Sequence, residues 1–168
     1  MHWRQTDSTE PSRLADFSGA VRESSLKRFR AIPVGLENWR PLPTALSIAE
    51  IGRHLVHADR WLFKKLANPD LTPLIAEAGS LPLLTRGGYE ALLGDLEQTG
   101  QQRAALLRRL THDRLLARIP DPRFGGEASV WWVVVRGNLD HEIHHRGQLS
   151  TYQALLAKMG GAPQASAP

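Results

Sequence analysis

Two histidines in the last third of the chain have a spacing that suits a shared ligand. His141 and His145 are four residues apart, so on an α-helix they lie one turn apart on the same face. Neutral imidazoles are common ligands of zinc and other divalent transition metals. A metal site is therefore one hypothesis for this pair. The alternative is a pair of partly buried histidines that hydrogen-bond to the backbone or to Asn138, and the spacing alone favours that alternative.

A third histidine can join this pair from an earlier segment of the chain. His54 shares a predicted helical face with Ile51 and Ala58, so we expect it to point inward. Three neutral imidazoles around one ion leave at least one coordination position for water or substrate, which is typical of catalytic metal sites. The other histidines of the predicted helices have charged or polar neighbours, and we expect them to face solvent: His57, His112 and His144.

The composition limits the chemistry that such a site can use. The chain of 168 residues has no cysteine, which excludes disulfides, thiolate zinc sites, a cysteine nucleophile and cysteine-held iron–sulfur clusters. Lysine and arginine exceed aspartate and glutamate by 21 to 17, a net charge of +4 that does not demand a nucleic-acid surface. There is no run of about 18 apolar residues and no apolar signal segment. We therefore expect a soluble cytoplasmic protein without a membrane partner.

Four helices are predicted to position these histidines. Apolar residues recur at helical spacing over residues 14–29, 48–66, 88–116 and 128–159. Ser47 and Glu50 form a capping-box pattern at the start of the second helix. Residues 130–135 are β-branched and aromatic and could form a strand, but no partner strand is evident, so we assign them to a buried helix.

These elements predict an all-α fold, a four-helix bundle with a long crossover connection between helices two and three. Residues 68–86 are rich in proline and do not fit one regular element. A connection of this length can span a whole helix, so the second and third helices can run parallel. We expect a single domain over residues 1–168 with a core from about 12 to 160 and a disordered tail over 162–168.

The sequence around the histidine pair resembles the signature of the DinB/YfiT-like superfamily. That signature is a histidine, three further residues and then His-Arg-Gly-Gln. It is complete here in His141, His145, Arg146, Gly147 and Gln148. The earlier segment matches a second family pattern, in which a serine and an apolar residue precede a His-Leu pair.

The residues that match this second pattern are Ser47, Ile48, His54 and Leu55. The resemblance extends over about residues 14–158, and these two motifs are its specific part.

The resemblance implies both a site and an activity. It implies that His54, His141 and His145 hold a divalent metal ion, commonly zinc, nickel or iron, in a cleft at one end of a four-helix bundle. It also implies a homodimer and a metal-dependent enzyme that acts on a small-molecule substrate. Characterised members of the superfamily include thiol S-transferases and a thiol-dependent isomerase. Our leading hypothesis is an enzyme whose metal ion activates a low-molecular-weight thiol that attacks a small electrophile.

Residues near the histidines have two interpretations each. Arg146 and Gln148 are the candidate catalytic residues, with roles in orienting substrate or in contacting a metal-bound ligand. Arg146 can instead form an ion pair between helices, and packing is the favoured role for Gly147 and Gln148. Asp16 and Glu50 are candidates to accept an imidazole N–H group.

Three alternatives to thiol transfer stay open. The first is hydrolysis by metal-bound hydroxide at the same histidines, although Glu142, the one carboxylate in the motif, is poorly placed as a general base. The second is a metal-binding protein without catalytic activity. The third is a nucleic-acid-binding protein, which the mixed charges and the absence of alternating aromatic residues disfavour. The third alternative depends on a group of arginines that we instead expect to lie on a solvated face: Arg103, Arg108, Arg109, Arg114 and Arg118.

Overall fold

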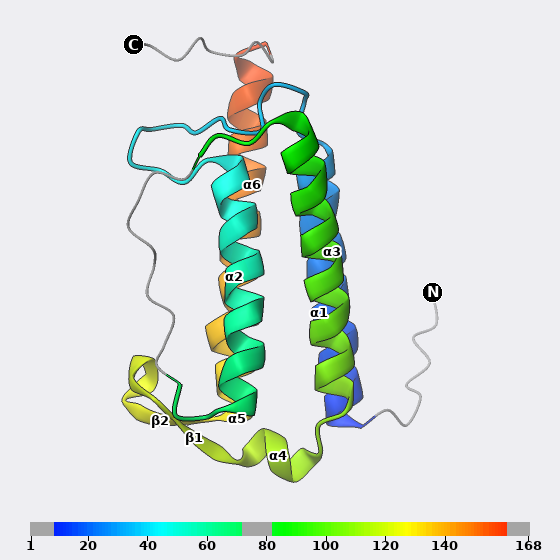
Figure 1. The fold of residues 1–168 in the computed structure, drawn as a ribbon, viewed down its shortest axis with the longest axis vertical. Helices are drawn as coiled ribbons and strands as arrows, with labels where there is room; N and C mark the ends of the chain where they lie inside the picture. The colour runs from blue at the N-terminus through cyan, green and yellow to red at the C-terminus, as the bar shows by residue number, and fades with distance from the viewer. Residues whose placement is uncertain (1–8, 72–81, 161–168) are drawn as a thin grey trace.

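Four long helices form the main part of the computed structural model, which describes residues 9–71 and 82–160. These helices are α1 (Glu10–Arg30), α2 (Ile48–Ala67), α3 (Arg86–Arg108) and α6 (Asp140–Lys158). Helices α1 and α2 each contact both α3 and α6, so the four helices enclose a common interior (Figure 1). The prediction of a mostly helical chain is confirmed. Among the described residues, no helix combines the length and the apolar character of a membrane span.

The start of α2 follows the capping box predicted from the sequence. The Ser47 hydroxyl accepts a hydrogen bond from the Glu50 amide, and the Glu50 carboxylate accepts one from the Ser47 amide. Helices α2 and α3 begin at the same end of the molecule and run parallel (Figure 1). Part of the connection between them, residues 72–81, and the tail 162–168 lie outside the described residues.

The predicted third helix, residues 88–116, is divided in two. Helix α3 ends at Arg108, and a short helix α4 (His112–Leu116) follows. The Thr111 hydroxyl accepts a hydrogen bond from the Arg114 amide and so caps the new helix. The break places the following chain across the end of the four long helices (Figure 1).

The all-α prediction missed a β-hairpin. Strands β1 (Arg118–Asp121) and β2 (Gly126–Ser129) pair in antiparallel fashion, and the 3-10 turn η1 (Pro122–Phe124) connects them. Gly125 and Gly126 have φ angles of 82° and 112°, which favour glycine. Strands of four residues are too short to show a clear alternation of apolar and polar residues. The sequence suggested a strand only in the segment that follows the hairpin.

That segment, residues 130–135, is helical as predicted. Helix α5 (Val130–Val134) begins where the Ser129 hydroxyl accepts a hydrogen bond from the Trp132 amide. A π-helical turn, η2 (Val135–Leu139), joins α5 to α6. The predicted fourth helix is therefore one helical run that begins two residues later than expected and contains a π-helix.

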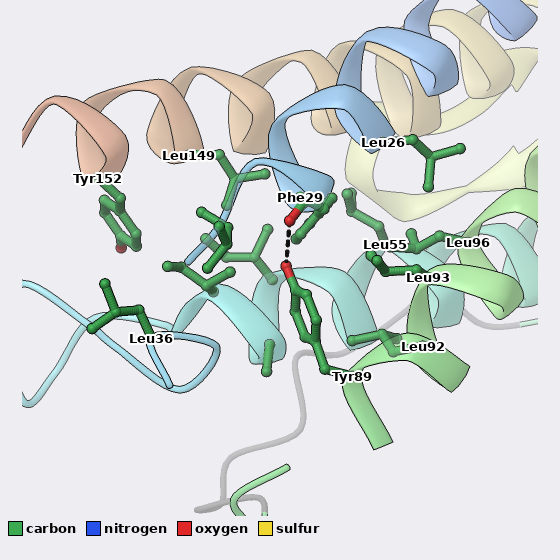
Figure 2. Close-up of a cluster of buried hydrophobic side chains, with 14 of the residues drawn as sticks. Leu26, Phe29, Leu36, Leu55, Tyr89, Leu92, Leu93, Leu96, Leu149 and Tyr152 are labelled. Carbon is green, nitrogen blue, oxygen red and sulfur yellow. Dashed lines mark hydrogen bonds between the residues drawn. The ribbon is translucent and has the colours of Figure 1, made fainter. Parts of the chain in front are cut away.

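Two apolar clusters fill the interior at different heights. One contains Phe29, Tyr89 and Leu149, and within it the Tyr89 hydroxyl donates a hydrogen bond of 2.9 Å to the Phe29 carbonyl (Figure 2). The other contains Leu62 and Leu139. Along α6, polar residues lie between Leu139 and Leu149, and these residues include the histidine pair.

Candidate metal centre

The structure brings together the three histidines that the sequence singled out. His54 extends from α2, and His141 and His145 extend from successive turns of α6. The Nε2 atom of His141 lies 2.8 Å from Nε2 of His54 and 3.1 Å from Nε2 of His145. On α6 the histidine pair lies between Leu139 of one apolar cluster and Leu149 of the other, whereas His54 on α2 lies among residues of the cluster that contains Leu149. The other three helical histidines are exposed, as expected: His57, His112 and His144.

Hydrogen bonds alone cannot satisfy this cluster. The Nδ1 atom of His145 lies 2.7 Å from Oε1 of Gln148, so Nδ1 carries the proton and Nε2 keeps its lone pair. The His141 Nε2 atom faces two other Nε2 atoms and can either donate one hydrogen bond or accept one. One of the two short contacts is therefore left without a hydrogen bond when the rings are neutral.

The rings are neutral at pH 7. Burial lowers the pKa of His141 to about 4, and the neighbouring charges of His145, His54, His144 and Arg123 act in the same direction. Burial likewise lowers the pKa of His145 to about 4, although the Gln148 side chain opposes the shift. Burial also lowers the pKa of His54. Three uncharged imidazoles thus face one another through their Nε2 atoms.

The donor set and its spacing fit a divalent metal ion. A tetrahedral ion with metal–nitrogen distances of about 2.0–2.1 Å separates its ligand atoms by about 3.3 Å. One ring nitrogen from each of the three histidines lies within 4.8 Å of the other two. Two of the three separations, 2.8 and 3.1 Å, are close to the value of about 3.3 Å for a tetrahedral site. The Gln148 contact fixes His145 in the tautomer that a metal ligand needs.

The residue after His141 belongs to a second polar cluster, which is fully buried. The Glu142 carboxylate accepts hydrogen bonds from Arg22 and forms an ion pair of 2.8 Å with Arg103. Asp59 of α2 binds the same two arginines, each at 2.8 Å. These contacts lower the pKa of Glu142 to about 2 despite its burial, so the carboxylate is ionised.

This ionic cluster was not predicted. Arg103 was expected on a solvated face, yet it is fully buried and also bonds to Ser18. Arg22 and Asp59 lie at buried positions of α1 and α2. A charged residue within an apolar stripe was the sequence signal that could have indicated this cluster. Because Glu142 is held by two arginines, it does not point its carboxylate at the histidines.

The residues proposed to support the imidazoles have other partners. Asp16 is exposed and pairs with Arg108, and Glu50 binds Ser47 and Arg40, so neither accepts a bond from a histidine of the cluster. Gln148 has that role, which corrects the expectation that it serves in packing.

Two other residues of the motif also differ from expectation. Within residues 9–71 and 82–160, the Arg146 side chain has no ion pair, so the interhelical pair, one of its two proposed roles, is not observed there. Gly147 is exposed, and a Cβ atom added to it would meet nothing within 4 Å, which contradicts a role in close helix packing.

Comparisons with known proteins identify the family of the chain and a solved structure with a similar fold. The family profile of the DinB superfamily matches residues 19–149. The crystal structure of a DinB-like protein, YjoA from Bacillus subtilis, is similar with a TM-score of 0.63 and 17% sequence identity, over 93% of this chain and 95% of that one. No curated protein matches the chain. The chain therefore belongs to the DinB superfamily.

Proposed function

We propose that His54, His141 and His145 bind a divalent metal ion, which is zinc, nickel or iron, and that the chain is a metal-dependent thiol S-transferase. The observation that carries this proposal is the convergence of three neutral Nε2 atoms, two pairs of which are 2.8 and 3.1 Å apart. Three protein ligands leave a position open for substrate. When bound there, such an ion makes a low-molecular-weight thiol acidic and so supplies a thiolate near neutral pH.

The chain's own residues would hold and orient the reactants. The three histidines fix the position of the thiol sulfur, and Gln148 keeps His145 in the required tautomer. Binding to the ion would lower the pKa of the thiol enough for its proton to pass to water, so this reaction needs no general base from the chain. Hydrolysis on the same histidines is the second candidate, and it lacks a nearby general base because Glu142 is bound to Arg22 and Arg103.

The finer architecture and assembly are part of the same proposal. We infer that the four long helices are a four-helix bundle with a crossover between α2 and α3, and that the chain is a single domain. We further propose a cytoplasmic homodimer that acts on a small molecule and not on nucleic acid. Light scattering during size-exclusion chromatography tests the dimer, and a monomeric mass at micromolar concentration would contradict it.

Elemental analysis of the protein without a histidine tag tests the metal site. We expect close to one zinc, nickel or iron ion per chain in the wild type and none in a His54→Ala, His141→Ala, His145→Ala variant. A His57→Ala, His112→Ala variant is the matched control, because these histidines are exposed, and it should keep its metal. Absence of metal from the wild type after reconstitution with each ion, or retention of metal by the triple variant, would overturn the proposal.

The reaction is tested on the metal-loaded protein. We expect loss of a low-molecular-weight thiol together with a small electrophile such as an alkyl halide or epoxide, at a rate that depends on the three histidines. Turnover of activated esters without any thiol would instead support hydrolysis. Inactivity toward both classes of substrate would contradict the proposed enzymatic activity and would support a metal-binding protein without catalytic activity.

A further inference from the structure

The β-hairpin places one arginine beside the histidine cluster. Arg123, in the turn between β1 and β2, lies with its Cζ atom 4.4 Å from the centre of the Trp61 ring on α2. A Cβ atom at Gly137 of η2 would be only 3.0 Å from the Nη2 atom of Arg123. The absence of a side chain at Gly137 therefore lets the guanidinium lie against the helical backbone. Arg123 therefore contacts two elements of the site. One is α2, which carries His54, and the other is η2, which leads into the helix that carries the histidine pair.

The position of Gly137 relates this arginine to the histidines. Gly137 precedes His141 by four residues, about one helical turn or 6 Å along the axis. Helical side chains lean toward the N-terminal end, so the His141 ring leans toward the turn that contains Gly137. The guanidinium thus lies within electrostatic range of the histidine cluster.

The hairpin holds Arg123 in a fixed orientation. The buried Asp121 carboxylate accepts hydrogen bonds from Nε and Nη2 of Arg123, at 3.0 and 2.7 Å. The Nη1 atom forms no hydrogen bond with the described residues, and the side chain is 28% exposed. The side chain thus keeps hydrogen-bonding capacity and is partly open to solvent.

The local charge is positive even though Asp121 is paired. Arg123 lowers the pKa of the Asp121 carboxyl against the opposing effect of burial, and Lys65 contributes in the same direction. The Lys65 ammonium donates to the carbonyls of Pro69 and Leu71, which carry no charge. One carboxylate thus faces two cations.

We propose that Arg123 binds the carboxylate of the substrate, and that the substrate is a short thiol acid whose sulfur reaches the three histidines. The planar guanidinium matches a carboxylate, and its orientation is already fixed by Asp121 and Trp61. A separation of about one helical turn suits a molecule with two or three carbons between sulfur and carboxylate. This inference rests on the proposed function and specifies the class of substrate for that site.

Two thiols of equal length test the inference on protein loaded with cobalt(II). The probes are 3-mercaptopropionate and 3-mercapto-1-propanol, and sulfur-to-cobalt absorption measures the binding of each. In Arg123→Gln we expect the acid to bind about tenfold more weakly and the alcohol to bind as in the wild type. The matched control is Arg118→Gln, which removes an exposed charge from the same hairpin and should change neither affinity.

The outcomes separate this inference from the proposed function. Unchanged acid binding in Arg123→Gln, or equal weakening of acid and alcohol, would overturn the role of Arg123. Failure of the wild type to bind cobalt would instead overturn the metal site, and this is seen before any thiol is added.

If Arg123→Gln does not fold, Gly137→Ala provides the second variant. Its methyl group would lie 3.0 Å from Nη2 of Arg123 and displaces the guanidinium while the charge is retained. We expect selective weakening of acid binding in this variant as well, and an unchanged ratio of acid to alcohol affinity would contradict the inference.

Discussion

Two polar clusters use neighbouring residues of α6 in opposite ways. Glu142 joins two arginines and a second carboxylate, and every charge in that ionic cluster has a partner of opposite sign. His141, one residue earlier, faces two other histidines whose lone pairs hydrogen bonds cannot all satisfy. The difference teaches that a buried polar cluster with complete internal pairing holds helices together. An incompletely paired cluster is a site for something that the chain does not supply.

The largest expected effect comes from breaking the ionic cluster. Replacing Glu142 by Gln leaves Arg22 and Arg103 with one buried carboxylate between them. Removal of one partner from a buried ion pair costs about 3–5 kcal/mol. We expect the free energy of unfolding of the metal-free protein, measured in urea, to fall by this amount.

The matched control for this variant is Glu90→Gln, which breaks an exposed pair with Arg86. Exposed pairs contribute about 1 kcal/mol or less, so the control should stay close to the wild type. A similar loss in both variants would mean that the ionic cluster has no special structural role.

The second prediction concerns the histidine cluster and the metal. A metal ion at a hundred times its dissociation constant should raise the free energy of unfolding by about 2.7 kcal/mol, because it binds only the folded chain. His54→Ala should lose this increment. Glu142→Gln should keep the increment, although its free energy of unfolding without metal is lower. Thermal unfolding with and without zinc measures both, and an equal increment in His54→Ala would show that the metal binds elsewhere.

A third prediction isolates the residue that supports His145. Gln148→Leu removes the acceptor for His145 Nδ1–H and leaves all three ligands in place. Loss of such a supporting group typically weakens metal affinity by about 10–100-fold. Competition with a chelator measures the affinity, and an unchanged dissociation constant would show that the contact does not set the tautomer.

The two clusters should also respond to acid in different pH ranges. The pKa values of His141 and His145 are about 4 when folded and 6.5 when unfolded, so the unfolded chain binds more protons between these limits. Stability should therefore fall as pH is lowered from 6.5 to 4. The Glu142 pKa falls from 4.5 to about 2 on folding, so its contribution is present above 4.5 and is lost below it.

Urea unfolding of metal-free protein across pH 3–8 separates these ranges. A His141→Gln, His145→Gln variant should show a shallower fall between pH 6.5 and 4 than the wild type. Identical pH profiles would contradict the neutral state assigned to the histidines.

The histidine cluster was more predictable than the ionic cluster for a physical reason. Histidines at i and i+4 are adjacent on any helix, so local spacing identifies the pair. Arg22 and Arg103 lie on different helices, and their partners depend on the packing of all four long helices. An arginine favours an exposed position by its type, and although Arg22 stands in an apolar stripe, only the assembled fold shows which carboxylates the two arginines bind.

The same distinction explains the fold. Long apolar stripes and the Ser47 capping box are local signals, and α1 and α2 follow them. The hairpin depends on pairing between two strands of four residues, and two adjacent glycines such as Gly125 and Gly126 by themselves indicate only a turn. Arg123 was missed together with the hairpin, because nothing in its local sequence places it beside α2.

The smallest predicted effect concerns a motif residue that belongs to neither cluster. Gly147 is exposed within α6, and an added Cβ would meet open space. Glycine in a helix interior is about 0.8–1 kcal/mol less favourable than alanine, so Gly147→Ala should raise the free energy of unfolding by up to this amount. Metal affinity should not change, because the methyl group touches neither the histidines nor the ionic cluster. A loss of stability would show that space at Gly147 is needed for a contact outside the single chain, such as the proposed dimer, and measuring the variant's mass in solution would distinguish that case.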